Sequence, residues 1–259
     1  MDADVPPQPD PIDARLAPPP PASFSLRASL SALLQIVLCS GLPTQLAITG
    51  LLVALGVART PADLMAPGLI ATVALVDTVL IVALIVLFLT AGGERPRDVL
   101  FGGRLQSIEI GLGLALVPVV FIGLVASVVT LQHLAPALHN VKDSPLEAFY
   151  DTPFHRALFA VVAIVAGGVR EELQRGFILH RFEQRLGGAT VGLVISSVAF
   201  GAGHFIQGYD VAVAMILVGL AWGLLTLKRR SVVASMTCHA GFNAIEVALG
   251  FLKVMIPVK

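Results

Sequence analysis

Charged side chains are scarce in this chain. Asp, Glu, Lys and Arg make up 13% of its 259 residues, whereas 56% of the residues are hydrophobic. A soluble globular domain carries about 25% charged residues, so the composition excludes an ordinary soluble fold. The charges that are present sum to a formal net charge of zero, which gives no support to nucleic-acid binding. The composition therefore indicates an integral membrane protein.

Cysteine and several well-known catalytic motifs are also scarce or missing. The only two cysteines, Cys39 and Cys238, lie in apolar runs, which predicts small buried side chains and no disulfide framework. The sequence contains no Gly-x-Ser-x-Gly nucleophile elbow, no His-Glu-x-x-His metal motif, and no P-loop or dinucleotide fingerprint. A serine hydrolase of that type therefore lacks its nucleophile, and a nucleotide-binding protein lacks its loop.

The distribution of apolar residues divides the chain into three parts. Residues 1–26 are rich in Pro and Asp and cannot bury a core, so we expect a disordered tail with polyproline II character. Residues 27–153 are expected to form N-terminal transmembrane helices. Residues 154–259 are expected to form a second helical part, which carries most of the polar residues that lie in apolar surroundings.

Long hydrophobic runs predict the fold class, an all-α polytopic membrane bundle of about seven transmembrane helices. A helix that crosses a bilayer needs about 20 mostly apolar residues. The first run is longer than one span requires, and we expect Pro43, near Gly41, to kink it. Two spans there would each be too short. The seven predicted spans are 28–58, 68–89, 107–131, 154–185, 189–205, 211–227 and 231–251.

The Lys and Arg residues predict how this bundle is oriented. With the N-terminus inside, ten of them fall in inside loops and five in outside loops. Cytoplasmic loops carry an excess of Lys and Arg, so we expect a cytoplasmic N-terminus, most simply in a bacterial cytoplasmic membrane.

An acidic pair and an arginine lie directly after an apolar stretch of the fourth run. An ionisable group at bilayer depth costs about 2.5–3.5 kcal/mol or more, so it usually faces a protein interior and serves a function. Arg175 can pair with either Glu171 or Glu172 on a helix, and the two glutamates point about 100° apart. Helical spacing does not choose which of them is a base. The alternative is a solvated ion-pair stripe, which we expect for the charged residues of 181–185.

Two histidines and an amide add further polar groups to later runs. A lone His204 would often be a satisfied interior residue, but beside an intramembrane carboxylate pair it is a candidate base or metal ligand. His239 and Asn243 are four residues apart and share a helical face. Both side chains can donate hydrogen bonds to a developing oxyanion if the relevant histidine nitrogen carries a proton. Together these residue types favour activation of a water molecule.

Three other acids lie at membrane depth. Asp77 lacks an obvious partner in the sequence and is a candidate transport residue. Glu109 lies near the start of the third run. Glu246 falls three residues beyond Asn243, where it could orient the site or lie in a wet vestibule.

Three motifs in a fixed order resemble a known family. Glu-Glu-x-x-Arg at 171–175, Phe-x-x-x-His at 200–204 and His-x-x-x-Asn at 239–243 occur on successive apolar runs. This pattern resembles the CAAX prenyl protease family of intramembrane glutamic peptidases, which includes bacterial abortive-infection and bacteriocin self-immunity proteins. The resemblance covers residues 154–252, so it implies that residues 154–259 form a CAAX-protease-like catalytic core.

The resemblance also implies roles for these residues. By analogy, Glu171 and His204 activate the attacking water, and His239 with Asn243 forms the oxyanion hole. The second glutamate and the arginine of the first motif, Glu172 and Arg175, would shape the site. We expect no cofactor. Two histidines and a glutamate are also a plausible zinc set, which would be Glu171, His204 and His239.

The predicted function is therefore an intramembrane endopeptidase. Its partners would be the lipid bilayer and a peptide or protein substrate anchored in the membrane, with CAAX-type processing implied by the resemblance. A proton-coupled transporter is an alternative, but it predicts inverted repeats with broken helices, which the sequence does not show. A non-catalytic membrane immunity or adaptor protein is a third reading, in which the polar residues only hold helices together.

Overall fold

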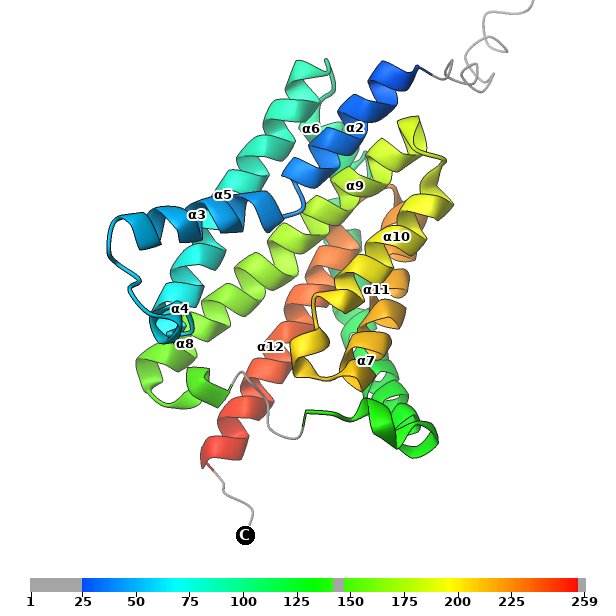
Figure 1. Cartoon of the computed structure of the whole chain (residues 1–259). Coiled ribbons are helices and arrows are strands. Elements are labelled where there is room, and N and C mark those ends of the chain that lie inside the picture. Colours follow the sequence, from blue (N-terminus) through cyan, green and yellow to red (C-terminus); the bar gives the residue numbers. More distant parts are fainter. Residues whose placement is uncertain (1–24, 142–146, 256–259) are drawn as a thin grey trace, which may run out of the picture.

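The chain folds as a bundle of helices (Figure 1). The structure is a computed structural model that describes residues 25–141 and 147–255. Every regular element in these ranges is helical, so the predicted all-α class is confirmed. The predicted tail lies outside the described residues up to residue 24, and a helix begins at Leu26.

Eleven α-helices, one π-helical segment and three 3₁₀ turns make up the described part of the chain. The α-helices are α2 (Leu26–Leu38), α3 (Leu42–Ala54), α4 (Pro61–Leu64), α5 (Pro67–Ala91), α6 (Pro96–Phe101), α7 (Gln106–Leu134), α8 (Pro153–Val162), α9 (Glu171–Arg185), α10 (Ala189–Ala202), α11 (Tyr209–Arg229) and α12 (Val233–Met255). The π-helical segment is η3 (Ala163–Arg170), and the 3₁₀ turns are η1 (Pro136–Leu138), η2 (Glu147–Tyr150) and η4 (Phe205–Gln207).

The predicted count of seven spans is not confirmed. By length and composition four helical stretches can cross a membrane, namely α5, α7, the continuous stretch from α8 to α9, and α11; the bent pair α2 and α3 is a fifth if it counts as one span. Helix α10 has only 14 residues, about 21 Å, against a hydrocarbon core of about 30 Å. Helix α12 is long enough, but it carries polar residues of the proposed site. Both helices nevertheless lie within the bundle (Figure 1).

The expected kink in the first run is confirmed, and it places a polar cluster. Helices α2 and α3 meet at 45°. Gly41 adopts a φ of 87°, which favours glycine, and Pro43 lies in the first turn of α3, where a missing N–H costs little. The bend brings Thr44 and Gln45 to the buried carboxylate of Asp77 in α5, and both donate hydrogen bonds to it. Asp77 therefore has partners, contrary to the sequence prediction.

The distribution of side chains is that of a protein surrounded by lipid. Large apolar side chains face outward along α5 and α7, such as Val79 and Ile122, which are 68% and 66% exposed. Acidic side chains are buried instead, and Glu109 and Glu172 are both 0% exposed. Extended apolar surface with ionisable groups inside is expected in a bilayer, so these features fit an integral membrane protein.

A polar cluster joins helices at the end of the bundle where α5 and α9 end. Glu94, which follows α5, accepts hydrogen bonds from Arg181 Nη1 at 2.5 Å, from Gln184 Nε2 at 2.7 Å and from His180. Burial alone would raise the pKa of Glu94, but these hydrogen bonds outweigh it and hold the pKa below its usual value. Arg181 is only 5% exposed, so its prediction as part of a solvated stripe is wrong.

Two glycines let α12 approach the π-helical segment closely. A Cβ atom on Gly168 would lie 2.6 Å from the Cα of Ala240, and one on Gly167 would lie 2.6 Å from Nδ2 of Asn243. Small residues are the usual means by which membrane helices pack backbone against backbone. π-helical turns are rare and occur frequently at functional sites. The segment directly before Glu171 therefore depends on these glycines for its contact with α12.

We predict that Gly168→Ala destabilises the protein. The added methyl group must push α12 away from η3, and overpacking of this kind typically costs about 1–3 kcal/mol. The apparent midpoint of thermal unfolding in detergent should fall. Gly123→Ala in α7 is the control, because a Cβ atom there meets nothing within 4 Å. Equal midpoints for the two variants would contradict the proposed packing role.

Candidate active site

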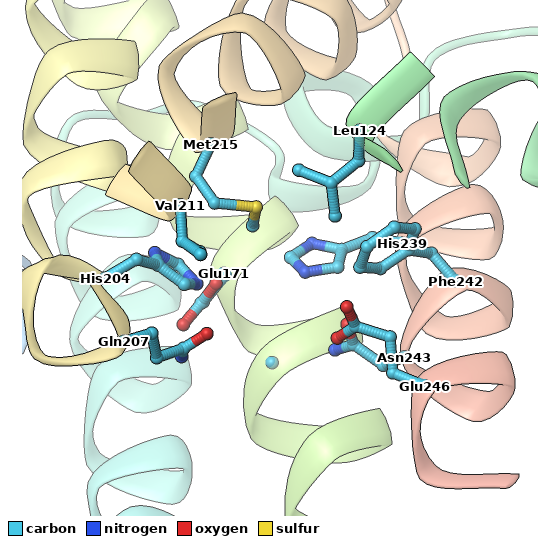
Figure 2. Close-up of a pocket in the computed structure, with 11 residues that line it drawn as sticks. Leu124, Glu171, His204, Gln207, Val211, Met215, His239, Phe242, Asn243 and Glu246 are labelled. Carbon is cyan, nitrogen blue, oxygen red and sulfur yellow. The ribbon is translucent and has the colours of Figure 1, made fainter. Parts of the chain in front are cut away.

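Four of the six predicted site residues line one pocket (Figure 2). Its polar lining consists of Glu171, His204, Gln207, His239, Asn243 and Glu246. Leu124, Gly167, Val211, Met215 and Phe242 complete the wall. The cavity volume is about 110 Å³, and a water molecule needs about 10–15 Å³ in this measure, so several waters fit. The pocket therefore brings together residues from six segments, α7, η3, α9, the turn from α10 into η4, α11 and α12.

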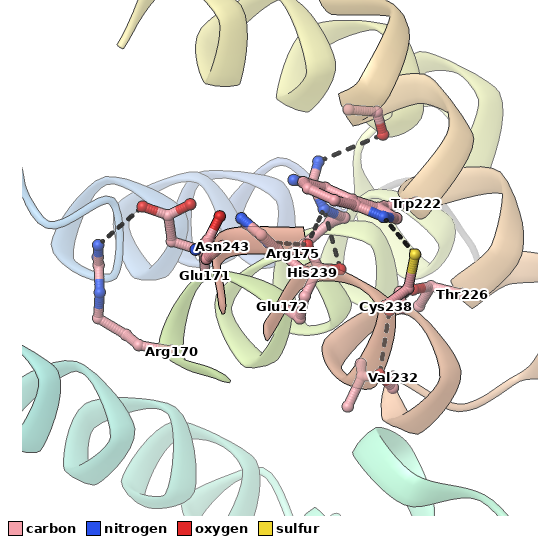
Figure 3. Close-up of polar contacts among 12 residues, drawn as sticks. Arg170, Glu171, Glu172, Arg175, Trp222, Thr226, Val232, Cys238, His239 and Asn243 are labelled. Carbon is pink, nitrogen blue, oxygen red and sulfur yellow. Dashed lines mark hydrogen bonds and ion pairs between the residues drawn. The ribbon is translucent and has the colours of Figure 1, made fainter. Parts of the chain in front are cut away.

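Glu171 reaches the pocket from the first position of α9 and is held by a neighbouring arginine. Its side chain is 28% exposed, and Arg170 Nη2 donates to its Oε1 at 3.2 Å (Figure 3). The same guanidinium group lies 3.5 Å from Oδ2 of Asp77 and donates to Gln174 Oε1 at 3.1 Å. Arg170 thus connects the pocket carboxylate to α5. Arg170 was not among the residues predicted from the sequence, although a cation directly before an intramembrane acid pair was a usable signal.

Glu172 does not line the pocket but lies behind it, fully buried. Its Oε1 accepts hydrogen bonds from Arg175 Nε at 3.2 Å and from His239 Nδ1 at 3.0 Å. Arg175 is also buried, and its Nη1 donates to the carbonyl oxygen of Gly219 at 3.4 Å. Of the two partners that helical spacing allowed for Arg175, the structure therefore selects Glu172. The carboxylate joins α9 to α12.

The ring of His239 is held on several sides. Trp222 stacks on it with ring centroids 3.8 Å apart and an interplanar angle of 21°, and Phe200 meets it edge-on at 5.9 Å. A carboxylate only accepts hydrogen bonds, so Nδ1 of His239 must carry the proton that Glu172 receives. This leaves Nε2 as the second polar atom of the ring. Nothing in the sequence indicated the contact between Trp222 and His239.

Two other pocket residues are oriented by backbone carbonyls. Asn243 Nδ2 donates to the carbonyl oxygen of Ala163 at 2.6 Å, which uses one of its two amide hydrogens. His204 Nδ1 lies 2.9 Å from the carbonyl oxygen of Phe200. Since a carbonyl only accepts, that nitrogen is the protonated one and Nε2 of His204 remains available. Each side chain thus keeps one polar group for another partner.

Two polar residues extend the pocket beyond the predicted set. Glu246 in α12 lines it, which agrees with the expectation of a vestibule more than with that of a buried orienting group. Gln207 in η4 was not predicted; it lies three residues after His204 in an otherwise apolar turn, and that was the only signal. In Figure 2 these two side chains lie on opposite sides of the open part of the pocket.

The alternative zinc set shares the pocket but does not gather into a metal site. Glu171, His204 and His239 all line the cavity. Within residues 25–141 and 147–255, however, no group of three His, Cys, Asp or Glu side chains is arranged to hold a metal ion. One nitrogen of each histidine is already engaged by protein. The expectation that no cofactor is used stays a prediction, which insensitivity to chelators would test.

The comparison with protein families agrees with the position of this site. Residues 153–245 match the family model described as type II CAAX prenyl endopeptidase Rce1-like. The matched segment begins with α8 and contains all six predicted site residues. No curated protein and no solved structure matches the chain. The resemblance inferred from the motifs is thus confirmed, and residues 153–245 are similar to the Rce1-like type II CAAX prenyl endopeptidases.

Proposed function

We propose that the protein is an intramembrane endopeptidase that hydrolyses a peptide bond of a membrane-associated substrate with a water molecule activated by Glu171. The observation that carries this proposal is the shared pocket of Glu171, His204, His239 and Asn243. The family supports a membrane peptidase in general, and the roles of single residues are part of the proposal.

Water activation is assigned to Glu171 with His204. The carboxylate of Glu171 is partly exposed to the pocket, which has room for the attacking water. It accepts a proton from that water while the oxygen attacks the scissile carbonyl carbon. Nε2 of His204 orients the same water, and Glu171 then returns the proton to the leaving amine. Proton transfer by a positioned side chain contributes about 10²–10⁴-fold to a rate.

Stabilisation of the tetrahedral oxyanion is assigned to His239 and Asn243. Asn243 retains one amide hydrogen beyond its bond to Ala163. His239 can donate from Nε2 only when both ring nitrogens carry protons. The buried carboxylate of Glu172 would balance that positive charge, and the face of Trp222 would stabilise it through a cation–π interaction. Glu172 and Arg175 act in this scheme by positioning His239 without touching the substrate.

We predict that Glu171→Gln lowers turnover by at least about 10²-fold, because the amide cannot accept the proton of water. Purified protein in vesicles would be incubated with a membrane-anchored peptide library, and new termini would be counted by mass spectrometry. Glu183→Gln is the matched control, since Glu183 lies on the same helix and pairs with Arg230 at the protein surface. If Glu171→Gln cleaved as fast as Glu183→Gln, Glu171 would not be the base.

Removal of the amide donor should affect chemistry more than binding. For Asn243→Ala we expect kcat to fall by about 10²–10³-fold with little change in KM, since the oxyanion exists only after attack has begun. Circular dichroism and the unfolding midpoint would show whether the loss of the bond to Ala163 also perturbs the fold. A rise in KM at unchanged kcat would instead assign Asn243 to substrate binding.

A further inference from the structure

The positive charges of the described chain gather at one end of the bundle. At this basic end α9 and α11 finish and α7 and α12 begin. Contacts tie its segments together: Ser29 Oγ donates to the carbonyl oxygen of Arg185 at 3.0 Å, and Arg104 Nε donates to that of Arg229 at 3.0 Å. The Lys and Arg residues at this end are Arg27, Arg95, Arg97, Arg104, Arg181, Arg185, Lys228, Arg229 and Arg230. Those described at the opposite end are Arg59, Arg156 and, near the end of α12, Lys253.

This asymmetry orients the bundle in a membrane. Short loops on the cytoplasmic side carry an excess of Lys and Arg, and acidic residues contribute little to this bias. The ion pairs of Arg181 and Arg229 with Glu94 and Glu109 therefore do not cancel the signal. The basic end is expected to face the cytoplasm.

The pocket extends toward the other end, where Gln207 and Val211 line the part that we assign as its mouth. Val211, in the first turn of α11, lines the pocket and lies 18 positions before Arg229, so the two are about 27 Å apart along the helix. That distance is close to the thickness of a bilayer core, about 30 Å. Gln207 precedes Val211 on η4 and also lines the pocket (Figure 2). The lining includes no residue from the last turn of α9 or α11 or from the first turn of α12.

The residues beside the mouth have the character of a membrane interface. Phe205 and Ile206 on η4 are 57% and 52% exposed, and Tyr209 at the start of α11 is 51% exposed. Tyr is enriched where the bilayer meets water, because its ring is apolar and its hydroxyl is polar. Near this position Asp210 accepts hydrogen bonds from Gln132 and His139, which attaches the end of α7 to the start of α11.

We propose that the pocket opens to the extracytoplasmic side of the membrane, and that its substrate is a polypeptide segment that reaches the bilayer from that side. The proposed substrate rests on the proposed peptidase function, whereas the proposed side of the pocket opening does not. A segment held at the cytoplasmic surface would lie across the membrane from Gln207. A pocket with this sidedness would not process lipid-anchored C-termini at the cytoplasmic surface.

Cysteine accessibility tests the sidedness directly. Gln207→Cys marks the mouth, Ala137→Cys in η1 marks the same end outside the pocket, and Arg97→Cys marks the basic end. The native Cys39 and Cys238 are 0% exposed, so the parent protein supplies the background. Right-side-out and inside-out vesicles from bacterial cells would be treated with a membrane-impermeant maleimide.

We expect Gln207→Cys and Ala137→Cys to label above background in right-side-out vesicles and Arg97→Cys only in inside-out vesicles. Labelling of Gln207→Cys from the same side as Arg97→Cys, or no more than the parent in right-side-out vesicles, overturns the inference. Because labelling needs no catalysis, it distinguishes this inference from the proposed function.

A second measurement adds an impermeant peptide outside each kind of vesicle, with Glu171→Gln as the background. Cleavage by right-side-out vesicles alone supports both proposals. Cleavage by inside-out vesicles alone supports the proposed peptidase function but contradicts the proposed sidedness. If the cysteines label as expected but no tested peptide is cleaved, the result supports the proposed sidedness and counts against the proposed peptidase function.

Discussion

The site depends on the hydrogen bonds of one buried carboxylate, that of Glu172. It is fully buried and accepts hydrogen bonds from Arg175 and from His239, so it joins α9 to α12. A buried charge is tolerated only when it is paired and hydrogen-bonded, and removal of one partner of such a pair typically costs about 3–5 kcal/mol. The same contact fixes which nitrogen of His239 faces away from Glu172. Trp222 and Phe200 then hold the plane of the ring.

Helices outside the family match also contribute to the site. Asp77 on α5 is held by Thr44 and Gln45 of α3, and it lies against Arg170, which in turn contacts Glu171. The bend at Gly41 is what brings α3 to this position. The N-terminal helices thus support the carboxylate of Glu171 through Arg170, although they lie outside the segment that matches the family model.

Part of this arrangement could be predicted from the sequence and part could not. The convergence of Glu171, His204, His239 and Asn243 was predictable, because each polar group at bilayer depth must face the interior. The partner of Arg175 was not, since residues three and four apart both share its helical face. The partners of Asp77 lie more than 30 residues away and meet it only after the chain bends. The short length of α10 depends on where the chain turns at Gly203, which hydrophobicity alone does not mark.

In the proposed mechanism, water activated by Glu171 attacks the peptide bond directly. Single-turnover cleavage in water enriched in oxygen-18, followed by mass spectrometry of product and protein, distinguishes direct attack by water from attack by the side chain of Glu171. We expect the new carboxyl terminus of the product to carry one oxygen-18 atom and the protein to carry none. Oxygen-18 in the side chain of Glu171 with an unlabelled product would contradict this mechanism, because Glu171 would then act as a nucleophile.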